Sequence, residues 1–316
     1  MRRRRTILLL SFIIGLTFSS CKKKDETVPA IVNPKETVAD MGANDETARA
    51  EYDRSLDDIF TALGNTSLNT GRASGPQGGV ILPCGVIKID STSIPGVFKF
   101  VYDSTCGVRV LSGSISVALT KGAMWSDVGA ELQLTFNNYN VLYTVNNQTL
   151  TFNGPMYITN VDGGWAWQVL TGSPSKTHAI RGSIDITFDK NDTRRWRIRK
   201  KRIFQSSSAS AADLTLTLDK DSAVAEVGTT RNGDPFTTDI TVPFKYINCN
   251  PQGNITGPFV AVTGTLVYAT ATESMTAEAG YKLVNQQATL DGTCSSEGYK
   301  LTYQIMNQTI SAFQYY

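Results

Sequence analysis

Apolar residues follow two different periods along this chain. From residue 45 to residue 63 they recur every three to four positions, which is the spacing of one face of an α-helix. From residue 80 onward they alternate with polar residues or form short runs rich in Val, Ile, Thr, Tyr and Phe, as β-strands do. The pattern predicts one helix followed by a long β region.

The predicted helix carries its own start and stop signals. Asn44 or Asp45 can cap its amino end, acidic residues occupy its first turn, and Gly64 stands where a glycine ends a helix. Its apolar stripe consists of Ala48, Tyr52, Leu56, Ile59, Phe60 and Leu63. We expect this stripe to pack on a sheet or at one end of the β region. Residues 44–79 are thus predicted to be a helix and a linker.

Strand-like segments then follow one another with short links. They cover residues 80–82, 98–102, 113–119, 132–145, 149–159, 165–170, 180–188, 196–204, 214–218, 236–247, 259–268, 281–290 and 299–310. Short links favour antiparallel neighbours, and no helix alternates with the strands, which disfavours parallel α/β folds. The sequence therefore predicts an all-β fold, a largely antiparallel β-sandwich or extended meander preceded by one N-terminal helix. Residues 80–316 would form this β domain, as one unit or as two sub-domains that divide near 206–235.

The segment 132–145 changes parity in its middle. Its apolar residues up to Phe136 share one face, whereas those from Tyr139 onward have the opposite parity. A β-bulge at Asn137 and Asn138 would keep both sets on the core side. Two separate strands that meet at a bend explain the same pattern.

The first twenty residues have the three regions of a secretory signal. Arginines at positions 2–5 precede an apolar run over residues 7–18, and small residues stand before Cys21. The apolar run is about half of the roughly 20 residues that span a bilayer, which disfavours a transmembrane helix. We expect residues 1–20 to be a lipoprotein signal peptide, Cys21 to carry the lipid, and residues 21–43 to form a flexible tether.

The residues after Cys21 favour an address in the bacterial envelope. Lysine, not aspartate, follows the cysteine directly, which resembles the rule that sends lipoproteins to the outer membrane. Lys24, Asp25 and Glu26 resemble the charged tag of lipoproteins exported to the cell surface, which favours the surface over the periplasmic face. The membrane, reached through the N-terminal lipid, is thus the first expected partner. A solvated charge run that only keeps the tether extended is the alternative.

Charge and cysteine content limit the remaining possibilities. Without residues 1–20, Lys+Arg falls from 30 to 26 against 28 Asp+Glu, so nucleic acid is not an expected partner. The four other cysteines are an even number in an exported chain, which indicates two disulfides with three alternative pairings. We favour Cys84 with Cys106 and Cys249 with Cys294, because each pair flanks strand-like segments in its own half of the chain. No Cys-x-x-Cys occurs, which disfavours a zinc site.

Several short motifs stand out along the mature chain. They are Cys84 before Ile87-Lys88-Ile89-Asp90, Tyr102-Asp103-Ser104-Thr105-Cys106 before Arg109 and Gly113-Ser114-Ile115, Thr135-Phe136-Asn137-Asn138-Tyr139, and Asp291-Gly292-Thr293-Cys294. Together with the acidic and apolar helix, these motifs resemble a group of secreted Bacteroidota lipoproteins with no assigned activity. The resemblance implies a Ser/Thr-rich, all-β lipoprotein with two disulfides. This chain departs from the group in having fewer glycines around its cysteines.

No set of catalytic residues is found in the sequence. His178 is the single histidine, and neither a Gly-x-Ser-x-Gly elbow nor a His-Glu-x-x-His motif occurs. We interpret His178 as a strand-edge residue rather than as a base. The protein is therefore expected to be non-enzymatic, with no cofactor and no metal. A carboxylate-dependent hydrolase is the enzymatic alternative, because a pair of carboxylates needs no histidine.

The segment 194–202 is the most basic part of the mature chain. On a strand, Trp196 and Ile198 lie on one face, and the other face carries a row of four basic residues. These are Arg195, Arg197, Arg199 and Lys201. A solvated face with cross-strand partners such as Asp185 is the plainer interpretation. The alternative is an anion-binding strip for an acidic glycan or a phosphorylated glycolipid.

A second candidate surface is aromatic. Trp165 and Trp167 would share one face of a predicted strand beside a glycine turn. If exposed, they would form a platform on which a sugar can stack, and if buried, they would belong to the core.

The leading functional hypothesis is a non-enzymatic envelope lipoprotein that binds a glycan, a lipid or a protein partner. A structural or assembly component of the envelope is the second hypothesis, and a hydrolase is the third. An exposed basic or aromatic strip favours the first, an unpaired sheet edge favours the second, and two carboxylates in one cleft favour the third.

Overall fold

One helix and one antiparallel sheet make up the described chain, which confirms the predicted all-β class with a single N-terminal helix. The computed structural model describes residues 38–63, 82–189, 192–231, 233–249, 259–305 and 308–315. The helix is α1 (Val38–Leu63), and two 3-10 turns, η1 (Ala166–Thr171) and η2 (Ala211–Asp213), lie between strands. The strands are β1 (Val86–Asp90), β2 (Val97–Cys106), β3 (Arg109–Lys121), β4 (Ala130–Tyr143), β5 (Gln148–Asn160), β6 (Lys176–Phe188), β7 (Thr193–Ser206), β8 (Leu214–Lys220), β9 (Glu226–Thr229), β10 (Pro235–Asn248), β11 (Phe259–Thr270), β12 (Ser274–Val284), β13 (Gln287–Leu290), β14 (Gly298–Ile305) and β15 (Gln308–Tyr315).

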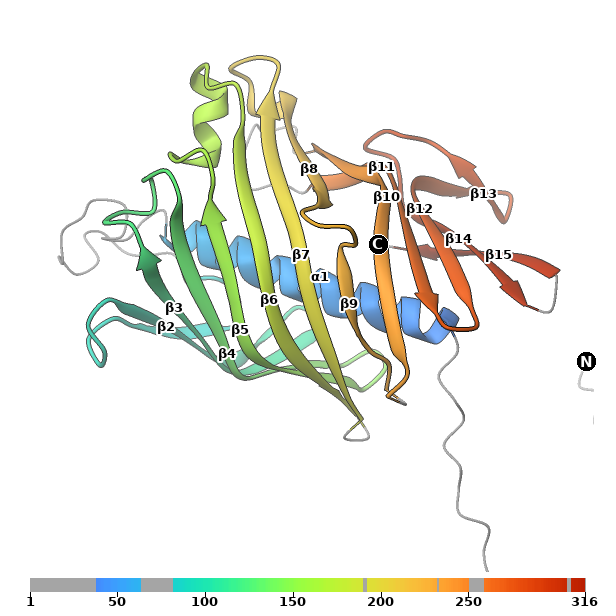
Figure 1. Cartoon of the computed structure of the whole chain (residues 1–316), viewed down its shortest axis with the longest axis horizontal. Helices are drawn as coiled ribbons and strands as arrows, with labels where there is room; N and C mark the ends of the chain where they lie inside the picture. The colour runs from blue at the N-terminus through green and yellow to red at the C-terminus, as the bar shows by residue number, and fades with distance from the viewer. Residues whose placement is uncertain are drawn as a thin grey trace, which may run out of the picture. The chain divides into compact units, whose positions relative to one another are not determined.

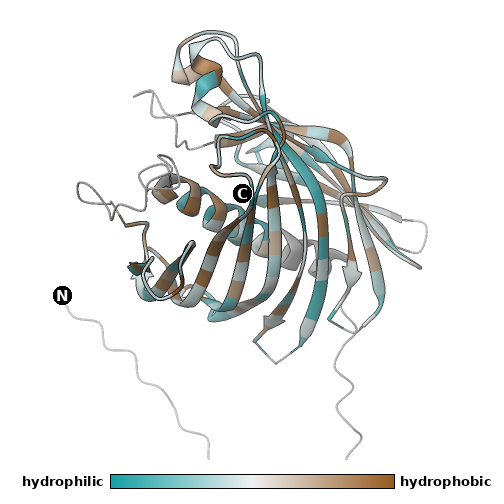
Figure 2. Cartoon of the chain, turned by 60° about the vertical axis from the view of Figure 1, so that its left-hand side comes forward, coloured by the Kyte–Doolittle hydropathy of each residue, from teal (hydrophilic) through white to brown (hydrophobic). Residues whose placement is uncertain are grey.

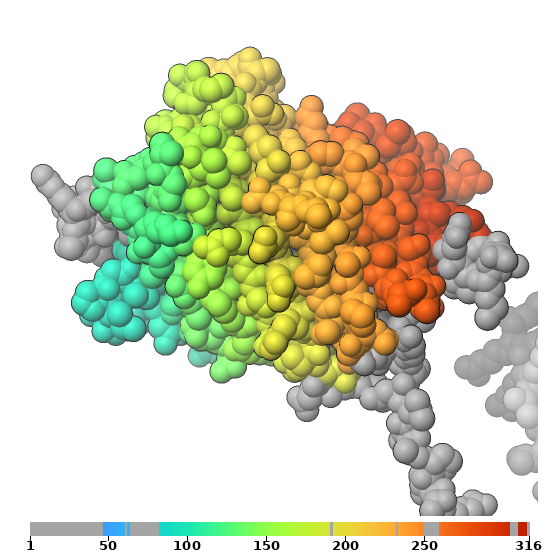
Figure 3. Space-filling view, viewed as in Figure 1, coloured from blue at the N-terminus to red at the C-terminus, as the bar shows by residue number. Residues whose placement is uncertain are grey.

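The strands pair almost entirely in their order along the chain. The sheet runs β1-β2-β3-β4-β5-β6-β7-β8-β10-β11-β12-β14-β15, with β9 paired to β7 and β10, and β13 paired to β12. The colours of Figure 3 therefore change steadily across the visible face, from green through yellow to red. The strands before, within and after residues 206–235, β7, β8, β9 and β10, belong to this one sheet. The architecture is thus the extended meander, not a two-sheet sandwich and not two sub-domains.

The sheet curves around α1, as Figure 1 shows, and a bulge contributes to the curvature. The pairing of β4 with β5 shifts between Phe136 and Tyr139, and Asn138 has a φ of 48°. Gly113 of β3 lies opposite this bulge, where an added Cβ would stand 1.9 Å from the Asn138 carbonyl oxygen. Only glycine fits such a close backbone approach. β4 is therefore one bulged strand, and the alternative of two separate strands is wrong.

The helix begins earlier than the sequence signals indicate. It starts at Val38, so Asn44 and Asp45 lie inside it and do not cap it, and residues 38–43 belong to the helix rather than to the tether. The residues before Asn44 include no proline after Pro34, and one glycine inside a helix costs only about 1 kcal/mol, so nothing there stops the helix. Gly64 lies outside the described residues.

Some strand predictions were wrong in detail. Residues 165–170 do not form a strand, because the 3-10 turn η1 begins directly after Trp165 and occupies Ala166–Thr171. The predicted strand 281–290 is a hairpin of β12 and β13, which turns at Asn285 and Gln286 with φ of 50° and 64°. Two consecutive positive φ values are the mark of a type I′ turn, and Asn and Gln give only a weak signal for it without glycine. The short strands β1 and β9 were not predicted.

The apolar stripe of α1 packs on the sheet, as predicted. Leu56 and Ile59 are fully buried, and the Tyr52 ring lies 6.1 Å from the ring of Phe136 and 6.0 Å from that of Trp196. Hydrophobic and hydrophilic residues alternate along the strands in Figure 2. Such alternation is expected of an antiparallel sheet with one face on a core and the other in water.

Both disulfides join cysteines within the same half of the chain. Cys84 is bonded to Cys106 and Cys249 to Cys294, with Cα atoms 5.5 Å and 5.6 Å apart. These are the two pairs that the sequence favours over the other pairings. Structural disulfides persist in oxidising compartments, so they indicate a location outside the cytoplasm.

Candidate functional site

β7 presents basic residues on both faces of the sheet. From Thr193 to Lys200 exposed and buried residues alternate, with Arg195, Arg197 and Arg199 exposed. Lys201, the fourth residue of the predicted strip, is half-buried. The four residues therefore lie in one row on the outer face of the sheet, as the period of two requires.

The two ends of this outer row are paired with acids. Arg195 donates to Asp185 of β6, with Nε 2.9 Å from Oδ1, and this is the cross-strand partner named from the sequence. The Lys201 Nζ lies 3.5 Å from Oδ2 of Asp219 on β8. Exposed pairs of this kind add little stability, but each cancels the charge of its basic residue.

No ion pair forms in the middle of the row within the described part of the chain, although Asp221 lies beside Arg199 and its backbone N–H donates to the Arg199 carbonyl oxygen at 3.1 Å. No ion pair joins Arg197 or Arg199 to any carboxylate within the described residues. The residues directly opposite them on β6 are Ser183 and Arg181. Arg181 is also exposed, so three arginines of two adjacent strands lie close together on the outer face. We call Arg181, Arg197 and Arg199 the arginine patch.

Arg181 is held in place by neighbours on β4 and β5. Its Nη2 donates to Oε2 of Glu131 at 2.8 Å, and its guanidinium lies 4.7 Å from the centre of the Tyr157 ring. Burial would raise the pKa of Glu131, but Arg181 and Lys121 outweigh it and lower that pKa below its usual value. Glu131 thus stays ionised and fixes the Arg181 side chain.

The inner face of β7 carries a second set of basic residues, which face α1. Lys200 and Arg202 are 4% and 5% exposed. Arg202 donates to Asp53 at 2.6 Å and to Asp57 at 3.0 Å, both on the helix. The period of two places Lys200 and Arg202 on the same face as Trp196, so the alternation in the sequence already indicates that they point inward.

Lys200 belongs to a buried triad with a helix residue and a residue of β9. The Glu226 carboxylate accepts from Arg49 of α1 at 3.1 Å and forms an ion pair with Lys200. Burial would raise the pKa of Glu226, but Arg49 and Lys200 together hold it at about 2. Glu226 is therefore ionised at neutral pH and joins the helix to two strands.

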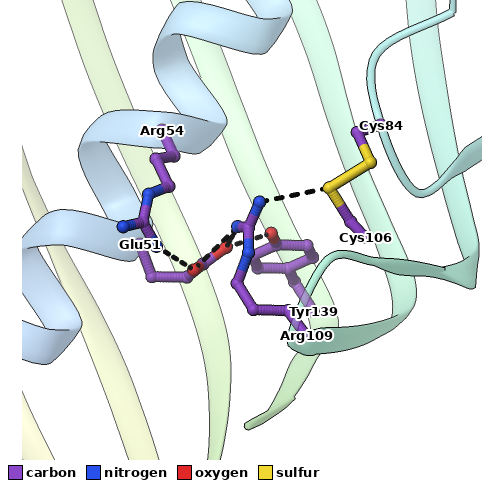
Figure 4. The surroundings of a disulfide bond; sticks show 6 residues. All are labelled: Glu51, Arg54, Cys84, Cys106, Arg109 and Tyr139. Atoms are coloured by element: carbon purple, nitrogen blue, oxygen red, sulfur yellow. Dashed lines mark hydrogen bonds and ion pairs between the residues drawn. A yellow bond between two sulfur atoms is a disulfide. The ribbon is translucent and has the colours of Figure 1, made fainter. Parts of the chain in front are cut away.

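The other flank of α1 is anchored through Glu51, which is fully buried. Its carboxylate accepts from Arg109 of β3 at 2.7 Å and from the Tyr139 hydroxyl of β4 at 2.8 Å. Burial raises the pKa of Tyr139, and the Glu51 charge raises it further, so the hydroxyl keeps the proton that it donates. In Figure 4, Arg109 lies between Glu51 and the Cys84–Cys106 disulfide, and its Nη2 is 3.3 Å from the Cys106 sulfur. The buried carboxylates of Glu51 and Glu226 thus each connect the helix to the sheet.

His178 is a core residue and not the predicted strand-edge residue. It is 4% exposed, and its ring lies 5.5 Å, 5.1 Å and 5.2 Å from the rings of Phe60, Trp125 and Phe204. Burial, and to a lesser extent Arg202, lowers its pKa to about 3. The imidazole is therefore neutral at physiological pH and enclosed by aromatic rings.

Trp165 and Trp167 do not share one face of a strand, as the sequence pattern predicts. They lie at the start of η1, where successive residues turn by about 120°, so residues two apart point in different directions. Trp165 is half-buried and packs against the core, whereas Trp167 is 44% exposed. The prediction failed because it assumed a strand for this segment.

Other predicted features lie outside the described residues. Cys21 and the segments 1–20 and 21–37 are outside the described part of the chain. Among the described residues, no group of three or more His, Cys, Asp or Glu side chains is placed to hold a metal ion. α1 is the long helix of this part, and no described helix combines the length and apolar content that a membrane span requires.

Comparisons with known proteins returned no relatives. The chain matches no protein-family model, no curated protein and no solved structure.

We predict that the Glu51 anchor is needed for stability. Arg109→Ala removes the closer and more buried of the two arginines that contact the fully buried Glu51 carboxylate, which is expected to lower the free energy of unfolding by about 3–5 kcal/mol. Arg54→Ala is the matched control, because Arg54 contacts the same carboxylate at 3.5 Å with a half-exposed side chain, and it should cost under about 1 kcal/mol. Urea unfolding measures both variants. Equal losses would contradict the role of Arg109.

We also predict an acid sensitivity that originates at His178. Its pKa is about 3 in the folded state against an ordinary 6.5, so only the unfolded chain binds the proton as the pH falls below 6.5. Stability should therefore decrease between pH 6.5 and 4, by about 3 kcal/mol from this residue. His178→Phe keeps an aromatic ring in place and removes this contribution. A free energy of unfolding whose pH slope is the same in both proteins over this range would refute the assignment.

Proposed function

We propose that this protein is a non-enzymatic lipoprotein of the bacterial outer membrane that binds an acidic glycan or glycolipid on the outer face of β7. The observation that carries the proposal is the pair Arg197 and Arg199, which are exposed and form no ion pair within the described residues. Like charges two residues apart on one strand face repel each other, and an anionic ligand relieves that repulsion. The arrangement supports recognition of charge rather than catalysis.

The proposed location at the outer membrane rests on separate observations. The two disulfides indicate a non-cytoplasmic compartment. The amino-terminal sequence supplies the rest, with a signal-like segment before Cys21 and lysine directly after it. Two or more acyl chains on Cys21 would attach the protein to the membrane durably, and the charged tag after it favours the cell surface over the periplasmic face.

A structural role in the envelope is the second candidate, and β15 favours it. β15 pairs with β14 along all eight of its residues, and no other strand of the described chain pairs with it. It carries no charged residue, whereas the opposite edge strand β1 carries Lys88 and Asp90. Charged side chains on an edge strand hinder pairing with another chain, so β15 is the more receptive edge.

We predict that the acidic-ligand binding depends on Arg197 and Arg199. The full chain should be retained on an immobilised polyuronate at low salt and released at high salt, since exposed charges are screened over about 8 Å at physiological ionic strength. Arg197→Ser with Arg199→Ser should weaken retention by about tenfold or more and change stability by under about 0.5 kcal/mol. Retention of the double variant equal to that of the parent would contradict the proposal.

A control variant with unchanged net charge tests whether binding depends on Arg197 and Arg199 or only on the overall charge of the face. Arg195→Ser combined with Asp185→Ser removes one arginine of the same row together with its acid, so the net charge of the face is unchanged. This control should bind like the parent. If it loses binding as strongly as the first variant does, the row does not act through its unpaired arginines.

We predict that anchoring requires Cys21. Cys21→Ser removes the thiol that would carry the lipid, so the variant should leave the outer-membrane fraction and appear unprocessed or soluble. Cell fractionation with detection of a lipid label measures this. Recovery of the variant in the outer membrane with lipid attached elsewhere would refute the proposed address.

A further inference from the structure

On the outer face of β7, the positive charge that no described acid neutralises is confined to a small area. Arg195 and Lys201, at the two ends of the row, are neutralised by Asp185 and Asp219. An extended polyanion that follows the strand would therefore meet unpaired positive charge only in the middle. The surplus lies instead in the arginine patch, which extends across the strands as much as along them.

The patch has the dimensions of one small anion. Arg199 lies directly opposite Arg181 in the β6–β7 pairing, and directly opposite residues have Cβ atoms about 4.5–5.5 Å apart. Arg197 follows two positions along β7, about 6.6–7 Å away. The Arg181 guanidinium leans over β5, toward Tyr157 and Glu131. The long side chains of Arg197 and Arg199 can extend from β7 across β6 toward its exposed edge. Ser183, opposite Arg197, adds a hydroxyl at the margin.

One arginine of the patch is already positioned. Arg181 is held by Glu131 at 2.8 Å and by the Tyr157 ring, yet its side chain remains 53% exposed. Lys121 also reaches Glu131, with Nζ 3.4 Å from Oε2, so two cations share one carboxylate and one positive charge remains. Arg181 is therefore fixed on the β5 side of β6, and Arg199, which forms no ion pair within the described residues, would approach a bound ligand from β7.

The chemistry of the patch distinguishes between classes of anion. A guanidinium donates two parallel hydrogen bonds to a phosphate or a carboxylate, but a phosphate monoester offers three oxygens and up to two charges on one centre. A carboxylate offers two oxygens and one charge, so it pairs with one guanidinium and does not compensate a second one beside it.

We propose that the arginine patch binds a phosphate monoester, with the phosphoryl group over β6 at the exposed edge of Arg181 and with Arg199 and Arg197 reaching it from β7. This inference rests on the proposed function, which assigns an anionic ligand to the same face, and it narrows the ligand to a phosphorylated one. The phosphate can be part of a soluble sugar phosphate or of a phosphorylated lipid headgroup, and the chemistry of recognition is shared by both.

The test uses the full chain and four probes. Titration calorimetry with glucose 1-phosphate and with glucose 6-sulfate compares a phosphate with a sulfate ester, which has one charge. Flotation with phosphatidylcholine vesicles that contain phosphatidic acid tests the lipid source, and the immobilised polyuronate tests a carboxylate polymer. Binding of glucose 1-phosphate without flotation assigns a soluble ligand, and binding in both assays assigns the phosphate group alone; either supports the inference.

Two variants and the pH dependence sharpen the result. Arg181→Ser and Arg199→Ser should each weaken binding of the phosphate probe by about tenfold or more, while Arg195→Ser with Asp185→Ser should leave it unchanged. Arg199→Ser breaks no side-chain ion pair within the described residues, so it remains informative if Arg181→Ser disturbs the fold through Glu131. Because the second pKa of a phosphate monoester is about 6, binding should strengthen from pH 5.5 to 7.5, and sulfate binding should not change.

The possible outcomes distinguish failure of the phosphate assignment from failure of the proposed function. Binding of the polyuronate but of neither phosphate probe overturns the phosphate assignment and leaves the proposed function standing. Binding of no anionic probe overturns both. Phosphate binding that persists at parent strength in Arg199→Ser, or that does not change between pH 5.5 and 7.5, places the ligand elsewhere and overturns the inference.

Discussion

The position of α1 on the sheet depends on buried ion pairs along both flanks of its apolar stripe. On one flank Glu51 is anchored to Arg109, and on the other Arg49 and Asp53 are anchored to Glu226 and Arg202. A buried ion pair gives little net stability compared with a well-packed apolar pair, but a missing partner costs several kcal/mol. Sliding the helix by one turn would keep much of its apolar contact and break every one of these pairs. The charges thus specify the register of the helix, and the apolar stripe supplies the burial.

The basic residues of β7 have two roles, one on each face of the sheet. Its inner residues Lys200 and Arg202 are committed to acids of the helix and of β9. Its outer residues face water, where Arg197 and Arg199 form no ion pair within the described residues. Because a strand places successive residues on opposite faces, the same run of charge serves both the core and the surface without conflict. Substitutions at neighbouring positions are therefore expected to have unlike effects.

Local patterns were sufficient for the elements that depend on neighbours in the sequence. The helical period at Tyr52 and Leu56 and the parity change at Asn137 identified the helix and the bulge of β4, since both are determined by residues a few positions apart. The same patterns fail at η1, where an apolar run predicts a strand and the structure has a 3-10 turn. A short apolar run does not distinguish a strand from a helical turn.

The candidate site was predictable in part. Period-two alternation placed Arg195, Arg197 and Arg199 on one face, and Asp185 was named as a partner for the strip. The contribution of Arg181 was missed, because it depends on the register between β6 and β7. The burial of His178 and the pairing of Glu51 with Arg109 likewise depend on how α1 lies across the sheet. Such long-range contacts leave no periodic trace in a single sequence.

The order of the strands has a consequence for how the chain folds. In a meander most pairings join segments that are adjacent in sequence, so the loops that must close are short and the sheet can grow strand by strand from any hairpin. The helix is the exception, since Arg49 reaches Tyr268, 219 residues further along the chain. A contact of that separation carries a larger loop-closure entropy than any hairpin does. Docking of the amino-terminal helix is thus the event of highest contact order, and it can be completed only after the strands that receive it have assembled.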